Sequence, residues 1–497
     1  MTDWRDEFIR EGLTFSDISL RPQHSALETR AGREGGPDTE TRLTPKIKLA
    51  VPIISANMDT VTESTLAIAM ARYGGLGIIH RNCGVSKQVE EVEKVKRAEE
   101  GFIRNPYTLY PADGVSRARE LMAEHQIDSV LIIDVGIGRE LVGLITKYEI
   151  ANASGNVGDY MKPRKDLIMI EADEPLREDT ARKMAEKVFK ENPLLGKLPF
   201  VGKRGKLLGL ITKKDLFRSA EYPNATKDEH GRLRVGAAIG IDEDALRRAD
   251  ALLIAGADVL VLDVAHAHAK RPMEMAKMIK RAFPDCELIA GNVATAEAVY
   301  AYANLGVPIE AIKVGIGPGA TCTTRMVAGA GVPQVSAILD CVREAEKNGI
   351  PIIADGGIRF PRDVAISIAC GASAVMVGTL FAGTDESPGN VIRDNDKLFK
   401  LVRGMSSLDV NVDIRGDKFV SNLDIKDMIQ PEGVSGRVPY RGPLIRVLGP
   451  LVAGLRSGMT YAGAHNIDEM RQFHPRKFTR VSPAAWQESK PHDIEIV

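Results

Sequence analysis

The sequence predicts an α/β protein: a (β/α)8 barrel, or TIM barrel, interrupted by an inserted pair of smaller α/β units. Three observations predict it. Short β-branched runs alternate with segments of helical spacing, as parallel strands and their crossover helices do. One interval between strands is far longer than a barrel connection needs. Inside that interval, a ten-residue pattern occurs twice.

Eight apolar runs are expected to form the barrel strands, because strands buried on both faces are apolar throughout. They are 48–56, 75–80, 234–240, 259–265, 287–293, 311–317, 350–358 and 374–380. Between later strands, segments such as 242–257 and 361–372 carry helical spacing. Eight alternating strand and helix units are typical of a (β/α)8 barrel.

The interval between the second and third strands contains the repeat. LVGLITKYEI (141–150) matches LLGLITKKDL (207–216) almost position by position, and each copy follows an amphipathic helical pattern. The repeat predicts a paired module inserted into a barrel loop; coincidence between two strand–turn–helix segments is the alternative. The expected domains are 1–102 (first part of the barrel), 103–222 (insert) and 223–497 (rest of the barrel).

The segment that follows the last strand is rich in Gly, Pro and charge and weak in periodicity. A long loop after a barrel strand is typical of a lid over an active site, expected here at about 385–446. A disordered insertion is the alternative.

Composition excludes several classes of protein. The chain has 497 residues and a net charge of −1, which gives no reason to expect nucleic acid or a membrane as partner. No apolar run reaches the roughly 18 residues of a membrane span, and MTDWRDEFIREG is too polar for a signal peptide. Five scattered cysteines without a CxxC pair predict a reduced, cytoplasmic protein without disulfides.

Polar residues follow the apolar strands, at the end of a barrel where active sites lie. They are Ser55, Asn57, Asp263, His266, Asn292, Cys322, Asp355, Gly356, Gly357, Gly378 and Thr379. Because unpaired polar groups are costly beside an apolar core, their convergence predicts a site. The glycine-rich strand ends GIGPG, DGGIR and VGT let main-chain amides approach a phosphate, so a phosphorylated ligand is expected.

Cys322 stands in the loop GIGPGATCTTR (315–325), among residues that do not belong to a core. A thiolate nucleophile needs exposure and dipolar support, which loop amides and Arg325 offer, and Thr324 is near enough to position a water. An inert loop cysteine is the alternative. His266 and His268 lack further ligands, so a lining of the strand mouth is expected there in place of a metal site.

Several motifs resemble the inosine-monophosphate dehydrogenase and GMP reductase family. They are SANMDTVTE (55–63), GGLGIIHRN (74–82), GIGPGATCTTRMVAGAGVPQ (315–334), RGMSS (403–407), PEGVSGRVPYRGP (431–443) and ESKPHDI (488–494). The resemblance covers essentially the whole chain, and the insert resembles the tandem CBS (Bateman) module of these dehydrogenases.

The resemblance implies that Cys322 forms a covalent thioimidate at C2 of a purine nucleoside monophosphate. The favoured reaction is NAD-dependent oxidation of IMP to XMP, in guanine nucleotide biosynthesis. One alternative is NADPH-dependent reduction of GMP to IMP with loss of ammonia. A second is a non-catalytic purine nucleotide sensor built on the repeat.

The resemblance also assigns roles to residues of this sequence. Catalysis would use Cys322, Thr324 and Lys418. The nucleotide would meet Ser55, Asp355, Gly357, Gly378, Thr379, Met405 and Glu432. The cofactor would meet Asp263, Asn292, Gly315 and Gly317. Potassium would bind at Gly317, Gly319 and Cys322, with Glu488 of a neighbouring copy. The implied assembly is a homotetramer, with octamers through the insert, and the CBS module would take adenine or guanine nucleotides.

The sequence departs from both family patterns. Lys418 and Phe419 stand where the dehydrogenases carry an Arg-Tyr pair, which favours the reductase. Leu408 stands where the reductases carry a glutamate, with Asp409 beside it. Ala320 and Val402 replace a serine and a tyrosine that contact phosphate in the family. The insert and the lid and tail motifs favour the dehydrogenase.

Overall fold

The structure is a computed structural model that describes residues 11–32, 34–98, 102–125, 127–136, 138–214, 216, 221–415, 430–472 and 477–491. Its contacts divide the chain into two compact units. The barrel unit comprises Met1–Lys96, Asn224–Asp228 and Leu233–Val497, and the insert unit comprises Arg97–Pro223 and Glu229–Arg232. Among the described residues, no helix combines the length and apolarity needed to cross a lipid bilayer.

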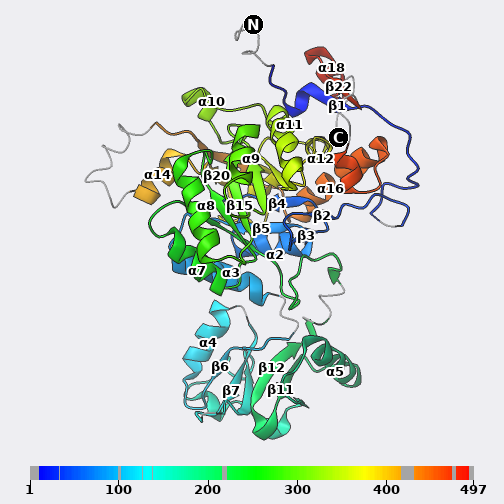
Figure 1. The fold of residues 1–497 in the computed structure, drawn as a ribbon. Coiled ribbons are helices and arrows are strands. Elements are labelled where there is room, and N and C mark those ends of the chain that lie inside the picture. The colour runs from blue at the N-terminus through cyan, green and yellow to red at the C-terminus, as the bar shows by residue number, and fades with distance from the viewer. Residues whose placement is uncertain are drawn as a thin grey trace, which may run out of the picture. The chain divides into compact units, whose positions relative to one another are not determined.

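The barrel unit is a closed parallel barrel with the strand order β13-β14-β15-β16-β17-β18-β4-β5, which confirms the predicted fold class. Its strands are β4 (Ile53–Ser55), β5 (Leu76–Ile79), β13 (Gly236–Ile239), β14 (Val259–Asp263), β15 (Leu288–Val293), β16 (Ala311–Val314), β17 (Ile352–Asp355) and β18 (Ala374–Val377). Figure 1 shows helices around these strands. They are α2 (Ser64–Arg72), α3 (Val85–Arg97), α7 (Ala245–Ile254), α8 (Lys270–Ala282), α9 (Ala296–Ala303), α11 (Gln334–Ala345), α12 (Pro361–Ala369) and α16 (Ile445–Ala462).

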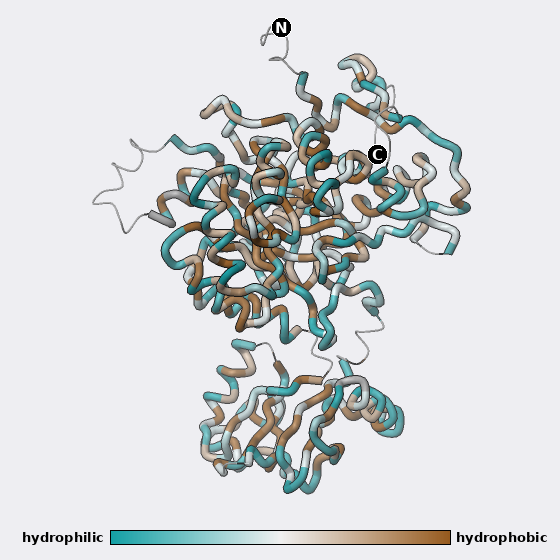
Figure 2. Tube along the Cα trace, viewed as in Figure 1, coloured by the Kyte–Doolittle hydropathy of each residue, from teal (hydrophilic) through white to brown (hydrophobic). Residues whose placement is uncertain are grey.

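The barrel interior is filled by alternate residues of each strand, because side chains along a strand point to opposite faces. Val259, Val261, Ile289, Ala311 and Ile353 all belong to one buried cluster inside the barrel. Figure 2 shows the apolar colour gathered on these strands. On β14, β16 and β17 the next inward position toward the carboxyl end is charged. The apolar core therefore ends in a charged layer at the mouth.

The predicted strand 48–56 is wrong in its extent. It divides into β3 (Lys48–Leu49), which pairs antiparallel with β2 (Thr41–Arg42), and the barrel strand β4. Pro52 separates the two segments. Proline has no N–H to donate to a strand ladder, so the chain cannot pair continuously through this position.

The expected lid is also more regular than its weak periodicity predicts. It contains a three-stranded antiparallel sheet of β19 (Ile392–Asp394), β20 (Lys397–Arg403) and β21 (Ser435–Pro439), and the helix α14 (Leu408–Arg415). Buried Lys400 donates to the carbonyl oxygens of Thr384, at 2.9 Å, and Ser387, at 2.6 Å. A lysine that holds main-chain carbonyls ties this sheet to the end of the last barrel strand. Lys418 and Phe419 lie outside the described residues.

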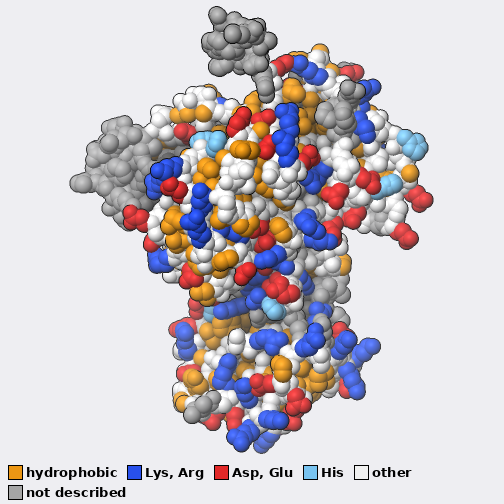
Figure 3. Space-filling view, in the orientation of Figure 1, with side chains coloured by type: hydrophobic (Ala, Val, Ile, Leu, Met, Phe, Trp, Pro, Cys, Tyr) orange, Lys and Arg blue, Asp and Glu red, His pale blue; other side chains and the backbone are white. Residues whose placement is uncertain are grey.

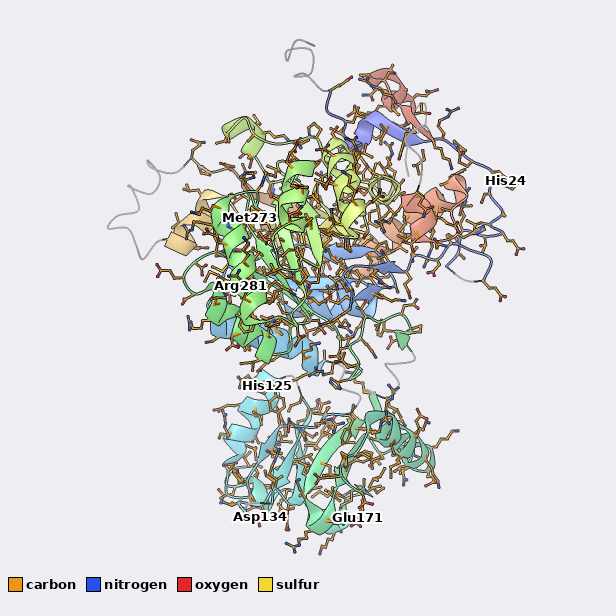
Figure 4. The ribbon with its side chains drawn as sticks, in the orientation of Figure 1. His24, His125, Asp134, Glu171, Met273 and Arg281 are labelled. Atoms are coloured by element: carbon orange, nitrogen blue, oxygen red, sulfur yellow. The ribbon has the colours of Figure 1, made fainter. Side chains whose placement is uncertain are left out.

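The insert unit contains the predicted repeat as two similar sheets. One is β6 (Thr108–Leu109), β7 (Ser129–Ile133), β8 (Leu141–Thr146) and β9 (Lys162–Pro163), with α4 (Val115–Glu124); the other is β10 (Ile170–Glu171), β11 (Lys197–Val201) and β12 (Leu207–Thr212), with α5 (Glu178–Glu191). The β7–β8 and β11–β12 hairpins each shift register at the last residue of their first strand. In Figure 4, His125 follows α4, Asp134 follows β7 and Glu171 lies in β10.

The remaining elements are short. They are η1 (Phe15–Asp17), β1 (Ile18–Leu20), η2 (Val157–Asp159), η3 (Arg164–Asp166), η4 (Lys203–Gly205), α10 (Thr324–Val327), η5 (Glu346–Asn348), α13 (Thr379–Ala382), α17 (Ile467–Arg471), β22 (Phe478–Arg480) and α18 (Pro483–Glu488). On the face of the molecule in Figure 3, acidic and basic side chains are interspersed, as the net charge of −1 leads one to expect.

Candidate active site

The cysteine loop connects β16 to α10 and is held in place on both sides of Cys322. Its neighbour Thr321 accepts a hydrogen bond at its carbonyl oxygen from the Val434 N–H, at 2.9 Å, and Thr323 donates its N–H to the Glu432 carbonyl, at 2.8 Å. The Cys322 N–H donates to the Gly319 carbonyl, at 3.1 Å. The segment that contains Glu432 and Val434 therefore fixes the position of Cys322.

The Cys322 thiol is half-buried, and its Sγ lies 3.2 Å from the Thr324 hydroxyl. Three of the other four cysteines, Cys286, Cys341 and Cys370, are buried. Burial raises the pKa of the Cys286 thiol to about 11 and that of Cys370 to about 12. Burial also raises the pKa of Cys341, and of Cys83, which is half-buried. Cys322 is instead half-buried with a hydroxyl beside its sulfur, which suits a thiol that meets a substrate.

Close packing of the main chain explains why Gly315 and Gly317 of the cysteine loop are glycines. A Cβ at Gly315, where φ is +153°, would lie 2.0 Å from the Asp355 carbonyl oxygen. At Gly317, where φ is +88°, a Cβ would lie 2.6 Å from Cγ of Arg325. Only glycine allows the loops after β16 and β17 to approach this closely.

The glycines after β17 and β18 lie at the ends of neighbouring strands, since Asp355 pairs with Met376 in the ladder. An ideal Cβ on Gly356 would lie 3.2 Å from the Gly319 nitrogen, so the DGG turn packs on the cysteine loop. Gly378 is the residue before α13, whose first residue is Thr379. The structure therefore brings Gly357, Gly378 and Thr379 to one edge of the barrel mouth.

Lys313 is at the centre of the charged layer, although the sequence did not single it out. Its ammonium lies 2.9 Å from Oδ1 of Asp263 and 2.7 Å from Oδ2 of Asp355, and it also donates to Oδ1 of Asn292. The Asn292 amide nitrogen donates to the Gly315 carbonyl, at 2.7 Å, and to Asp355, at 2.9 Å. Four of the predicted site residues thus share one network.

The charges in this network stabilise one another. Burial, the largest single influence, would raise the pKa of Asp263, but Lys313, Arg81 and Asn57 together outweigh it and lower that pKa below its ordinary value. Burial alone would lower the pKa of Lys313, but the Asp263 and Asp355 carboxylates outweigh it and raise that pKa. The ion pair between Lys313 and Asp263 is therefore charged at neutral pH.

Met405 and Glu432 lie on segments that pack against the cysteine loop. The N–H of Gly404, in the turn 404–407, donates to the Val434 carbonyl, at 3.0 Å, and Val434 is hydrogen-bonded in turn to Thr321 of the cysteine loop. The preceding Arg403 anchors the turn, because its guanidinium forms ion pairs with Asp59 and Asp413, both at 2.7 Å. Two segments of the expected lid, around Gly404 and around Val434, thus lie beside the cysteine loop.

Two predicted site residues, Ser55 and Glu488, take no part in the contacts described above. Ser55 is fully buried, and its hydroxyl lies 2.8 Å from that of Thr62. Glu488 lies on α18, where it is exposed. Lys418 lies outside the described residues.

Sequence reasoning missed Lys313 as the common partner of the predicted site residues in the charged layer. The signal was a lysine inside the apolar strand AIKV, two residues after the inward-facing Ala311. That spacing places its side chain in the barrel interior, where a charge persists only with partners.

A closed (β/α)8 barrel with a half-buried thiol and a charged layer at its mouth has the architecture of an enzyme of the TIM-barrel class. Residues 12–492 match the IMP dehydrogenase / GMP reductase domain family, and the chain belongs to this oxidoreductase family.

Relatives and solved structures cover nearly the whole chain. Inosine-5'-monophosphate dehydrogenase of Aquifex aeolicus (strain VF5) is 47% identical over 98% of this chain and 96% of its own length. The enzyme of the same name from Staphylococcus aureus (strain Mu50 / ATCC 700699) is 45% identical over 99% and 98%. A cysteine-to-alanine variant of GMP reductase from Trypanosoma brucei in complex with guanosine 5'-monophosphate is 36% identical, with a TM-score of 0.89 and coverage of 99% and 100%.

Proposed function

We propose that this protein oxidises IMP to XMP with NAD, through a covalent thioimidate on Cys322. The observation that supports covalent catalysis is the half-buried Cys322 thiol, held 3.2 Å from the Thr324 hydroxyl in a loop fixed on both sides. The oxidative direction is supported by the names of the two dehydrogenases that are 45–47% identical over nearly the full chain.

The nucleotide binds across the strand ends. Asp355 accepts hydrogen bonds from the ribose hydroxyls, because its exposed fraction of 19% leaves the carboxylate reachable. Amides of Gly357, Gly378 and Thr379 hold the phosphate. Met405 and Glu432 contact the base from the segments that cover the cysteine loop. Ser55 is given no direct contact, because it is fully buried.

The covalent step is nucleophilic addition of the Cys322 thiolate to C2 of IMP. The nicotinamide, when bound, accepts the hydride that leaves C2. Asp263 and Asn292, with the main chain at Gly315 and Gly317, orient that ligand beside the purine. The exposed fraction of Asp263 is 20%, which fits a carboxylate that meets a ligand.

Water then adds to C2 of the thioimidate and the thiolate leaves, giving XMP. Thr324 is placed to orient this water, because its hydroxyl is adjacent to the sulfur. Lys418 is proposed as the base that accepts the proton from this water, which requires burial to lower its pKa.

The carbonyl oxygens of Gly317, Gly319 and Cys322 fit a monovalent cation such as K+, because the donor set is neutral oxygen on one tight loop. The Gly319 carbonyl accepts the Cys322 N–H and keeps a second lone pair for the ion. Glu488 would reach the ion from a neighbouring copy, within a homotetramer that can stack into octamers.

Reduction of GMP to IMP with NADPH is the second candidate, with the same Cys322 thioimidate formed by loss of ammonia from GMP. It is favoured by Lys418 and Phe419 at the lid positions of the Arg-Tyr pair. The T. brucei GMP reductase variant, at a TM-score of 0.89, also favours it.

Two assays run side by side test the direction. NADH formation from IMP and NAD supports the dehydrogenase; NADPH consumption with ammonia release from GMP supports the reductase. Cys322→Ala is the control for both. If neither reaction proceeds while adenine or guanine nucleotides bind the insert unit, both catalytic proposals are wrong.

The insert unit is proposed to be a tandem CBS module that binds adenine or guanine nucleotides, in a cytoplasmic enzyme. Its two hairpins with matching registers support the first assignment.

A further inference from the structure

We propose that Lys313 is a positioning residue that orients Asp263 and Asp355 at the same time, so that cofactor and nucleotide bind to carboxylates that share one cation. This inference rests on the proposed function, because the two carboxylates are assigned there to the two ligands.

Burial separates the cation from the groups that ligands can reach. The Lys313 side chain is 2% exposed, whereas Asp263 and Asp355 are about ten times more exposed, at 20% and 19%. The lysine therefore cannot touch a ligand directly. It acts through the carboxylates, whose oxygens it contacts at 2.9 and 2.7 Å.

The hydrogen bonds assign one oxygen of Asp355 to the network. Lys313 and the Asn292 amide both donate to Oδ2, at 2.7 and 2.9 Å. Oδ1 has no protein donor in the hydrogen bonds of the described residues, and it is the oxygen left for a ligand hydroxyl. The amide of Asn292 is oriented in turn, because its nitrogen donates to the Gly315 carbonyl and its oxygen accepts from Lys313.

There is also an electrostatic reason for the two carboxylates to share the Lys313 ammonium. Two carboxylates held close together in a half-buried site repel each other, and one of them takes up a proton when no cation lies between them. A protonated carboxyl loses half of its ability to accept hydrogen bonds. Lys313 lies between the two carboxylates and fixes an oxygen of each, so both ligand sites depend on the same ammonium.

Lys280 offers a matched control. Its side chain is also 2% exposed, and its ammonium lies 2.7 Å from the carboxylate of Glu310, which is 9% exposed. Glu310 immediately precedes β16, so this pair lies at the opposite end of the strands, away from the proposed ligands. A purely structural role for Lys313 predicts that the two lysines behave alike.

The test compares Lys313→Met, Lys313→Arg and Lys280→Met in the full chain. Calorimetry measures the Kd of IMP without cofactor, steady-state kinetics measures the KM of NAD at saturating IMP, and thermal unfolding measures Tm. If the wild type turns over GMP and NADPH instead, those are the probes. In Lys313→Met the Kd of IMP and the KM of NAD both rise by about tenfold or more. In Lys313→Arg both return at least partly to the wild-type values. In Lys280→Met both stay within about twofold of wild type, even though its Tm falls.

Equal effects of Lys313→Met and Lys280→Met on both constants would overturn the inference, as would a rise in only one constant for Lys313→Met. If Lys313→Met does not fold, Lys313→Gln carries the same comparison, because it also removes the charge. If neither neutral variant folds while Lys280→Met does, Lys313 is a structural residue and the inference is wrong. A wild type that binds neither nucleotide refutes the proposed function itself, whereas wild-type binding with an unaffected Lys313→Met variant refutes the inference alone.

Discussion

The two ends of the barrel hold similar buried ion pairs that differ in what they leave open. At the amino end, the Lys280 ammonium is surrounded by Glu310 and the carbonyl oxygens of Pro284 and Cys286. In Figure 4, Arg281 marks this end of α8, one residue after Lys280. At the carboxyl end, Lys313 is equally buried, but its two carboxylates are about one-fifth exposed. The ion pair of Lys280 is almost fully enclosed, whereas the two carboxylates paired with Lys313 remain partly exposed.

The difference teaches how one interaction serves two purposes. A buried lysine is tolerated only when its partners satisfy it, so both ends obey the same electrostatic rule. Stability requires only that the pair be closed. A ligand site requires in addition that the partners be fixed while one side of each remains reachable.

The largest effect is expected at Cys322, the proposed nucleophile, at the carboxyl end of the barrel. Cys322→Ala should lower turnover by about 10⁴-fold or more, because the covalent path is lost. The nucleotide should still bind with little change in Kd, since the carboxylate and amides that hold it remain. Turnover within an order of magnitude of wild type would show that the thiol is not the nucleophile.

At the closed end, Lys280→Met should destabilise the protein without affecting catalysis. Removing one partner leaves Glu310 buried without its cation, which costs about 3 kcal/mol in the free energy of unfolding. Denaturant unfolding measures the loss, and kcat measured in parallel should stay at the wild-type value. A fall in kcat with unchanged stability would contradict the contrast between the two ends.

Thr324 should affect one step more than the other. Thr324→Val removes the hydroxyl near the Cys322 sulfur. Hydrolysis of the thioimidate should slow by about 100-fold, because a group that orients the water is lost. Hydride transfer, seen as a burst of reduced cofactor in stopped flow, should change less. Equal slowing of both phases would assign Thr324 to the addition step.

The smallest effect is an expected absence of pH dependence. Because Lys313 lowers the pKa of Asp263, the carboxylate stays ionised at every pH above about 4, and the KM of NAD should be flat between pH 6 and 9 as far as this group is concerned. Asn57 and Arg81 also favour its charged form. In Lys313→Met only burial, which raises the pKa, and these weaker partners remain, so the KM should begin to rise on the acid side. An unchanged acid limb in that variant would show that Lys313 does not set the charge of Asp263.

The sequence was informative wherever burial on both faces produced apolar runs. All eight barrel strands follow from that pattern, whereas the paired insert was predicted from its ten-residue repeat. The lid sheet did not follow, because β20 alternates only weakly and its anchor is Lys400, a residue type usually exposed.

The site was predictable in its members but not in its connections. Strand-end position was enough to select Asp263, Asn292 and Asp355. Their common partner Lys313 is 50 residues from Asp263 and 42 from Asp355, and only the closed barrel brings the three together. For Ser55, strand-end position was misleading, because its hydroxyl is buried against that of Thr62, a contact that the sequence gave no sign of.

Trapping of the enzyme during turnover tests the central claim most directly. The enzyme is mixed with IMP and NAD, or with GMP alone, quenched in acid and digested, and the peptide that contains Cys322 is weighed. The account predicts a mass increase equal to IMP less two hydrogen atoms, and the same mass from GMP by loss of ammonia if the reductive direction holds. Turnover with an unmodified Cys322 peptide, or with the adduct on another residue, would contradict it.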